Sequence, residues 1–353
     1  MSEPIRRIVA AVLTLVACTD SAAVEIHEPD VDGVGEVSDV IGIGDGSEMG
    51  DVRDVSEATT PAIDATPDVA SDLRGHRLTL DDGRVLVGEV IAIYDHALWT
   101  SPTEARTWAL FDPDAFGEWP DDRSLVFVDE ATITSAEATA LPAARLSWRD
   151  WLAAHGLGIQ RVPLTGASHV LMGHASWHLG EDGYGDFAWD LTYADASGAR
   201  WRGDGLDLDD YAVWDAPVVA PVAGTVVELV GDAPDNPPGT MPAAGLSAPE
   251  NLVGLRVAGA LHVYVLHLRA GSPVPTLGAV VAVGDPLGRV GNSGTTLEPH
   301  LHLAMLAWDF ERERFWSVPC DFFDVWVGAS PGDVRHAARV DPETGTWISS
   351  TPL

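Results

Sequence analysis

The chain has 353 residues, and 46% of them are hydrophobic, which is enough for a packed core. This length suggests two or three structural units. Acidic residues outnumber basic ones by 54 to 20, every basic residue is arginine, and the net charge is −34. Because nucleic-acid-binding proteins carry basic patches, this charge argues against a nucleic-acid partner. We expect the protein to be a monomer.

The N-terminus has the pattern of an export signal. Arg6 and Arg7 precede an apolar run at residues 8–17, which is too short to span a bilayer. The run ends in Leu-Val-Ala-Cys, and this cysteine is Cys18. The ending resembles a bacterial lipoprotein signal, in which the cysteine is lipidated and becomes the first residue. We therefore expect residues 1–18 to be a signal peptide with its lipobox, and the protein to be an exported, membrane-anchored lipoprotein that faces the periplasm or the cell surface.

The alternative is ordinary cleavage near Ser21, which would give a free secreted protein. If Cys18 is lipidated, Cys320 is the only other cysteine, so no intrachain disulfide can form and Cys320 is expected to be a small buried hydrophobe. Residues 19–74 are rich in Asp, Glu, Gly, Ser, Thr and Pro. Such a segment buries too little apolar surface to offset its ordering entropy, so we expect a disordered acidic linker.

A small β module is expected over residues 75–140. Asp82-Gly83 forms a hairpin turn between strands at 78–80 and 84–87. Further short strands are predicted at residues 90–94, 107–111 and 125–128. Five short strands favour a barrel-like or half-open sheet, which we interpret as an accessory module.

The connecting segment 141–158 contains one predicted helix, at residues 147–154. Ser147 is suited to cap its N-terminus, and Gly156 is suited to end it.

The stretch with the most chemical information runs GDPLGRVGNSGTTLEPHLHL and covers residues 284–303. Neighbouring side chains of a strand point to opposite faces, so His300 and His302 share one face, with Leu301 and Leu303 on the other. An ordinary half-buried strand would show the same pattern. Two imidazoles fixed by a strand, however, can also hold a metal ion and the group beside it.

Two other predicted strands carry candidate site residues. In the run Phe-Ala-Trp-Asp-Leu, Asp190 lies opposite its two apolar neighbours, which can face the core. In the strand at residues 261–268, alternation places His267 on the same face as Val265. His262 then points the opposite way and is expected to be structural.

The order of FAWDL, YVLHL, GDPLGRVGNSG and PHLHL resembles the lysostaphin/LytM-type zinc endopeptidases, which cut peptide bonds in bacterial cell-wall peptidoglycan. The resemblance covers roughly residues 160–310, and GNSG followed by PHLHL is its most specific part. It implies a mainly β catalytic domain over residues 159–328, built as an antiparallel β-sheet sandwich of the duplicated hybrid motif fold. Residues 329–353 are expected to be loop and C-terminal tail.

The resemblance also implies a set of zinc ligands. Asp190 and His302 match two of them. The first histidine ligand stays open: His178, twelve positions before Asp190, fits those members that have a longer loop between the histidine and the aspartate. His174 is the alternative, and Asp186 stands where the most familiar members carry the histidine.

His267 and His300 match the two catalytic histidines of the family, which stand beside the metal, orient the water and stabilise the charged intermediate. Two imidazoles and one carboxylate suit Zn²⁺, which lowers the pKa of a bound water so far that hydroxide forms near neutral pH. One of the catalytic histidines must carry a proton to the leaving amine. We therefore expect an exported zinc endopeptidase that cleaves the peptide cross-links of peptidoglycan.

Two other functions are compatible with the sequence. A non-catalytic LytM-like module would bind the wall or activate a partner amidase, and such relatives usually lack one or more metal ligands. An endopeptidase with the same site could also act on protein substrates.

Overall fold

The computed structural model describes residues 75–94, 106–174, 183–242 and 248–352. The predicted signal peptide, Cys18 and the acidic linker lie outside the described residues. The chain divides into two units, Met1–Asp68 and Val69–Leu353, and every described residue belongs to the second. Within the described ranges, no helix is both long and apolar enough to cross a bilayer.

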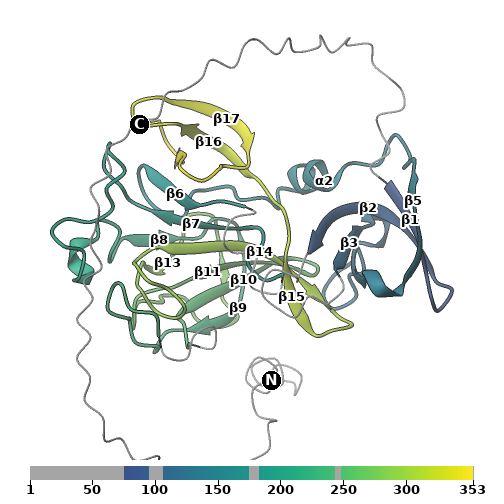
Figure 1. Cartoon of the computed structure of the whole chain (residues 1–353), viewed down its shortest axis with the longest axis horizontal. Coiled ribbons are helices and arrows are strands. Elements are labelled where there is room, and N and C mark those ends of the chain that lie inside the picture. The colour runs from purple at the N-terminus through teal and green to yellow at the C-terminus, as the bar shows by residue number, and fades with distance from the viewer. Residues whose placement is uncertain (1–74, 95–105, 175–182, 243–247, 353) are drawn as a thin grey trace, which may run out of the picture. The chain divides into compact units, whose positions relative to one another are not determined.

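The described fold is mainly β, as the sequence predicts, and its paired strands run antiparallel. A larger sheet of eleven strands contains β6 (Ser168–Met172), β7 (Ala188–Thr192), β9 (Gly224–Val230), β10 (Leu252–Ala258), β11 (Leu261–Leu266), β12 (Val280–Val281), β14 (Leu301–Asp309), β15 (Arg314–Ser317), β16 (Phe322–Gly328), β17 (Val334–Val340) and β18 (Trp347–Ser349). Ten strands follow the order β12-β9-β10-β11-β14-β7-β6-β18-β16-β17, and β15 pairs with β14 (Figure 1). A separate pair consists of β8 (Pro217–Val219) and β13 (Pro286–Arg289).

The central strands β11 and β14 are covered on both faces, which explains their nearly continuous apolar sequences. On one face, Val265 and Leu303 belong to the main hydrophobic core. On the other face, Tyr264, Leu266 and Ala304 belong to a smaller cluster. The alternation of the sequence thus divides each strand between two cores, and His302 lies on the side of the smaller one because it follows Leu301 and precedes Leu303.

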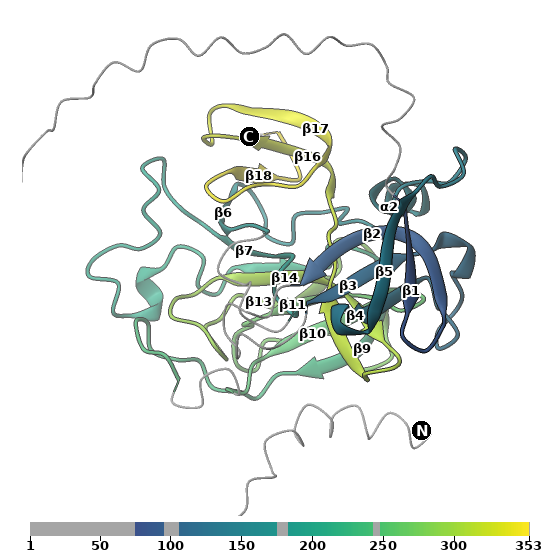
Figure 2. The same ribbon diagram turned by 45° about the vertical axis from the view of Figure 1, so that its right-hand side comes forward.

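The module at residues 75–140 is an open five-stranded sheet in the order β4-β3-β2-β1-β5 (Figure 2). Its strands are β1 (Gly75–Leu80), β2 (Val85–Tyr94), β3 (Thr107–Phe111), β4 (Leu125–Asp129) and β5 (Ile133–Thr139). The Asp-Gly turn is confirmed, since the amide of Leu80 donates to the carbonyl of Arg84 and Gly83 has a left-handed φ of 85°.

The number of strands in this module is as predicted, but two of the predicted strands are wrong. The runs at 84–87 and 90–94 form one strand, β2, in which Gly88 allows the backbone of Phe111 to approach closely. β5 is not among the predicted strands, because most of its residues are exposed and it lacks a regular apolar alternation.

The predicted connecting helix is confirmed as α2 (Trp148–His155). Ser147 Oγ accepts a hydrogen bond from the amide of Asp150, and Gly156 ends the helix in the left-handed conformation with φ 65°. Both ends therefore follow the usual capping chemistry.

The five-stranded sheet shares its core with the larger sheet. Phe127 of β4 stacks on Trp316 of β15 with 5.3 Å between ring centroids. The hydroxyl of Tyr94 donates to the carbonyl of Ser317 (2.6 Å), and the buried carboxylate of Asp122 accepts from the amide of Ala260 (2.8 Å). The five-stranded sheet is thus packed against the larger sheet through both apolar and polar contacts.

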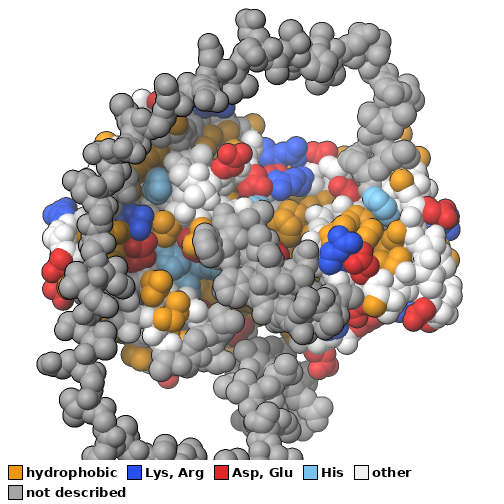
Figure 3. All heavy atoms as spheres, viewed as in Figure 1, with side chains coloured by type: hydrophobic (Ala, Val, Ile, Leu, Met, Phe, Trp, Pro, Cys, Tyr) orange, Lys and Arg blue, Asp and Glu red, His pale blue; other side chains and the backbone are white. Residues whose placement is uncertain are grey.

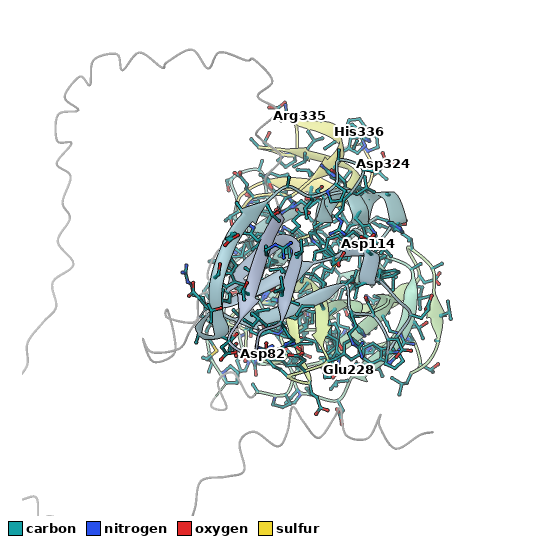
Figure 4. The ribbon with its side chains drawn as sticks, turned by 90° about the vertical axis from the view of Figure 1, so that its right-hand side faces the viewer. Asp82, Asp114, Glu228, Asp324, Arg335 and His336 are labelled. Carbon is teal, nitrogen blue, oxygen red and sulfur yellow. The ribbon has the colours of Figure 1, made fainter. Side chains whose placement is uncertain are left out.

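The C-terminal residues 329–353, expected to be loop and tail, instead contain β17 and β18. β17 pairs with β16, and β18 lies between β16 and β6. Figure 4 labels Asp324 and His336 on the β16–β17 hairpin, where His336 Nε2 lies 2.6 Å from Asp324 Oδ1. These strands were not predicted, because β17 is largely exposed and β18 is very short, so tertiary pairing decides both. Cys320 is fully buried, as predicted, and burial raises the pKa of its thiol well above the ordinary value.

Candidate metal centre

Asp190 and His302 come from neighbouring strands and lie directly opposite each other. β14 pairs with β7 in the register that aligns these two residues. His302 Nδ1 lies 3.1 Å from Asp190 Oδ1, and both side chains are almost fully buried. Leu301 and Trp189 point into the main core on the other face of the sheet. The two polar side chains are therefore fixed by strands whose backs are packed.

His300 meets the same carboxylate from the residue just before β14. Its Nε2 lies 3.3 Å from Asp190 Oδ1, and its Nδ1 lies 2.8 Å from the carbonyl oxygen of Glu298. Because a carbonyl only accepts, Nδ1 carries the proton and Nε2 is the atom that faces the site. Burial lowers the pKa of His300, but the Asp190 carboxylate and the Glu298 carbonyl raise it by more, so that the pKa lies above its ordinary value.

The side chain of His267 lies in the cluster, but on a different face of the strand from the predicted one. The alternation of side chains along β11 would place His267 on the same face as Val265, but that face packs against the main core. β11 ends at Leu266, and His267 has a left-handed φ of 62°, which breaks the alternation. Its ring centroid lies 4.7 Å from that of His300 and 5.7 Å from that of His302. The predicted face was wrong, because a single backbone dihedral redirects this side chain.

The orientation of the His267 ring is set by buried hydrogen bonds. Its Nδ1 lies 2.8 Å from the carbonyl oxygen of Ser293, so Nε2 again faces the site. Ser293 Oγ accepts from the amide of Asn251 and donates to the carbonyl of Leu268. Burial, and then the neighbouring His300 and the other site histidine, hold the pKa of His267 well below its ordinary value.

His262 lies at the far end of β11 and takes no part in this cluster. Its ring packs against Phe315 at 5.0 Å and Trp119 at 5.7 Å between centroids. Burial lowers its pKa to about 4. This placement agrees with the structural role expected for His262.

The first histidine ligand stays open, because one of its candidates is not described. His178 lies outside the described residues. The alternative, His174, places Nδ1 at 2.8 Å from Asp341 Oδ2 and packs its ring 4.0 Å from that of Trp189. Trp189 and Asp190 point to opposite faces of β7. His174 therefore lies on the face of β7 that does not carry Asp190. Asp186 is buried just before β7.

The donor atoms that are described fit zinc. Tetrahedral ligands at the usual Zn–N and Zn–O distances lie about 3.3 Å apart, and the Asp190 oxygen and His302 nitrogen lie 3.1 Å apart. Within the described residues, no group of three His, Cys, Asp or Glu side chains is placed to hold a metal. Asp190 and His302 would thus supply two donors, and His178, a candidate for the third, lies outside the described ranges.

Figure 3 shows histidine side chains gathered on the surface over β11 and β13, beside hydrophobic side chains. The site residues Asp190, His267, His300 and His302 are between 3% and 7% exposed. These four polar side chains are therefore nearly buried, and the low effective dielectric around them strengthens their electrostatic interactions.

Asn251 and Glu298 support the site without having been predicted to do so. Asn251 is fully buried and bonds to Ala233 and Leu268 as well as Ser293, and Glu298 holds His300 through its main-chain carbonyl. Glu298 lies inside the stretch already singled out at 284–303. Asn251 has no comparable local signal, because its partners are distant in sequence.

Comparison with other proteins gives a likeness of fold. No protein-family model matches the chain, and no curated protein matches it. Among solved structures, a catalytic-domain mutant of the prophage-encoded M23 protein EnpA from Enterococcus faecalis has 18% identity and a TM-score of 0.28, and the match covers 46% of this chain and 94% of that one. The catalytic domain of the antimicrobial peptidase lysostaphin from Staphylococcus simulans has 16% identity and a TM-score of 0.26, and covers 48% of this chain and 92% of that one.

The described fold is similar to M23 peptidase domains. The SpoIIQ–SpoIIIAH pore forming complex also matches, with 15% identity and a TM-score of 0.28, over 45% of this chain and 88% of that one. At such identities and TM-scores the likeness concerns the fold and assigns neither a ligand nor an activity to this chain.

Proposed function

We propose that this chain is an exported zinc-dependent endopeptidase that cleaves peptide cross-links of bacterial peptidoglycan. One observation supports this most strongly. Asp190, His302, His300 and His267 come from three separate parts of the sequence, yet their side chains meet in one buried cluster. The residues match those that the LytM-type resemblance assigns to ligands and catalytic groups. An ordinary half-buried strand would not require this convergence.

In this proposal, Asp190 and His302 hold the zinc together with His178. When bound, zinc supplies a water of lowered pKa and polarises the scissile carbonyl. His300 and His267 each keep Nδ1–H on a backbone carbonyl and present Nε2 to the site. One Nε2 accepts the proton of the attacking water, and the proton is then delivered to the leaving amine.

The predicted signal and Cys18 complete the proposal. A lipid anchor followed by the acidic linker of residues 19–74 would tether the enzyme to a membrane while it reaches the wall. Because one acyl chain binds only weakly, stable anchoring requires more than one chain.

The test uses the full chain and two measurements. Purified protein should contain about one zinc per chain and should lower the share of cross-linked fragments obtained from purified sacculi, detected by mass analysis. The variant His302→Ala should lose both properties. A protein that binds sacculi without zinc, and binds equally well as His302→Ala, would be a wall-binding module instead.

A further inference from the structure

The loop between β9 and β10 contacts both of the segments that form the His267 hydrogen bond. One segment leaves β11 through His267 and Ala270, and the other leads to β14 through Asn292 and Ser293. Asp235, in the loop, accepts from the amide of Ala270 through Oδ2 (3.0 Å) and from the amide of Asn292 through Oδ1 (2.7 Å). A single carboxylate therefore joins the chain just after His267 to the chain just before Ser293.

The spacing between these two segments sets the position of the His267 ring. His267 Nδ1 lies 2.8 Å from the carbonyl oxygen of Ser293, and the amide of Gly291 donates to the carbonyl of His267 itself (2.9 Å). A Cβ atom at Gly291 would lie 2.5 Å from Asp235 Oδ1 and closer still to the amide of Arg269. Glycine at this position thus allows the close approach of the two segments that Asp235 joins.

Asn236 extends the contact with the second segment. Its amide donates to the carbonyl of Asn292 (2.9 Å), and its side-chain Nδ2 donates to the carbonyl of Gly294 (2.7 Å). In return, Asn292 Nδ2 donates to the carbonyl of Asn236 (2.9 Å). Ser293 lies between these two partners and is fully buried, so its backbone is held on both sides. The carbonyl that orients His267 therefore has little freedom to move.

The Asp235 bridge is stronger than an uncharged side chain could provide. Hydrogen bonds from backbone amides to a carboxylate are about twice as strong as neutral ones. Asp235 is also partly buried, whereas Asp232, three residues earlier in the same loop, is exposed. Because a misplacement of about 1 Å can lower the rate of an enzyme by about a hundredfold, a link at this place affects the reaction even where the fold survives without it.

We propose that Asp235 and Asn236 are positioning residues for His267, because they fix the Ser293 carbonyl that keeps the proton on Nδ1 and turns Nε2 toward the site. The inference rests on the proposed endopeptidase function, in which this orientation is needed for catalysis. Without the bridge, the two segments should separate and the His267 ring should adopt other orientations. Turnover should then fall while zinc stays bound. Neither positioning residue is assigned a contact with substrate or metal.

The first experiment measures kcat and KM for soluble cross-linked muropeptides with the zinc-supplemented full chain. Asp235→Ala should lower kcat by about tenfold to a hundredfold, with KM and zinc content within about twofold of the wild type. Asp235→Asn should lose nearly as much, because its amide group replaces one acceptor oxygen with a donor. Asn236→Ala should lose less, since its backbone bonds to Asn292 remain. Asp232→Ala is the control and should leave kcat and KM unchanged.

The second measurement does not depend on hydrolysis. In protein labelled with ¹⁵N-histidine, the Nδ1 proton of His267 is assigned by its absence from His267→Gln. It should exchange slowly with solvent, because it is buried and hydrogen-bonded. Asp235→Ala should speed this exchange by about tenfold or more, and Asp232→Ala should not. A purely structural role of Asp235 would lower the thermal midpoint without changing the exchange of this one proton at temperatures well below it.

The two measurements separate the positioning role from the chemistry. If Asp235→Ala keeps the kcat of an active wild type, or if kcat falls while the His267 proton stays protected, Asp235 does not act through His267 and the inference is wrong. An unprotected His267 proton in the wild type would equally overturn it. If Asp235→Ala speeds the exchange, yet the wild type carries no zinc and hydrolyses nothing, Asp235 still positions the ring and only the peptidase proposal fails.

Discussion

His302 Nδ1 lies 3.1 Å from Asp190 Oδ1, although the two residues are 112 positions apart in the sequence. They face each other across β14 and β7, and the same carboxylate oxygen lies 3.3 Å from His300 Nε2. A buried carboxylate is costly unless a cation or hydrogen-bond donors offset its charge. We therefore expect zinc binding and the positions of His300 and His302 to depend on the Asp190 carboxylate.

Asp190→Asn should abolish zinc binding, because an amide oxygen lacks the negative charge of the carboxylate. We expect the zinc content, measured by atomic absorption, to fall to less than about a tenth of the wild-type value. Asp321→Asn is the matched control, since Asp321 is also buried but pairs with Arg149 and does not face the site. Equal zinc loss in both variants would contradict the proposal that Asp190 is a zinc ligand.

His300→Gln should separate binding from catalysis. Because His300 is proposed to stand beside the metal without binding it, the variant should keep its zinc. The rate of hydrolysis should fall by about 10²- to 10⁴-fold, the usual contribution of a general acid or base. Zinc loss in parallel with activity would instead place His300 among the ligands.

Arg200→Gln should lower kcat with little effect on KM. The ion pair with Glu298 fixes the carbonyl that orients His300, and loss of this support should cost about tenfold in kcat. Arg202→Gln changes an exposed arginine in the same loop and serves as the control. An unchanged kcat in Arg200→Gln would mean that His300 is oriented without the ion pair.

His262 should make the protein sensitive to acid. Its pKa is about 4 in the folded state and near 6.5 when exposed. Above pH 6.5, His262 is unprotonated in both the folded and the unfolded state, so it does not change the free energy of unfolding there. Between pH 6.5 and 4 only the unfolded state gains the proton, and the free energy of unfolding falls by a total on the order of 3 kcal/mol before levelling off.

His262→Phe tests this prediction, since phenylalanine fits an aromatic surrounding and cannot titrate. Urea unfolding of the variant between pH 4 and 6.5 should show a pH slope that is smaller by about one proton. An identical slope in both proteins would remove His262 as a source of acid sensitivity.

Asp122→Ala should destabilise the packing of the five-stranded sheet against the larger one. The Asp122 carboxylate accepts from the amides of Ala260 and Ser124, and its removal leaves buried donors unsatisfied. We expect a loss of roughly 1–3 kcal/mol in the free energy of unfolding. Asp114→Ala, which removes an exposed ion pair with Arg145 (Figure 4 labels Asp114), should cost less than about 1 kcal/mol.

Local sequence determined the parts of this protein that depend on neighbouring residues. Alternation placed His302 and Asp190 opposite their apolar neighbours, and the Asp-Gly turn and the Ser147 and Gly156 caps are found as predicted. These features follow from the sterics and hydrogen bonds of a few consecutive residues.

Tertiary structure decided the rest. The register that brings His302 opposite Asp190 depends on pairing across more than a hundred positions, and periodicity within one strand carries no information about its partner. The left-handed backbone of His267, the buried bonds of Asn251 and the pairing of β17 and β18 likewise arise from distant contacts. The sequence thus specified which side chains could take part in the site, and the packing of distant strands determined which of them meet.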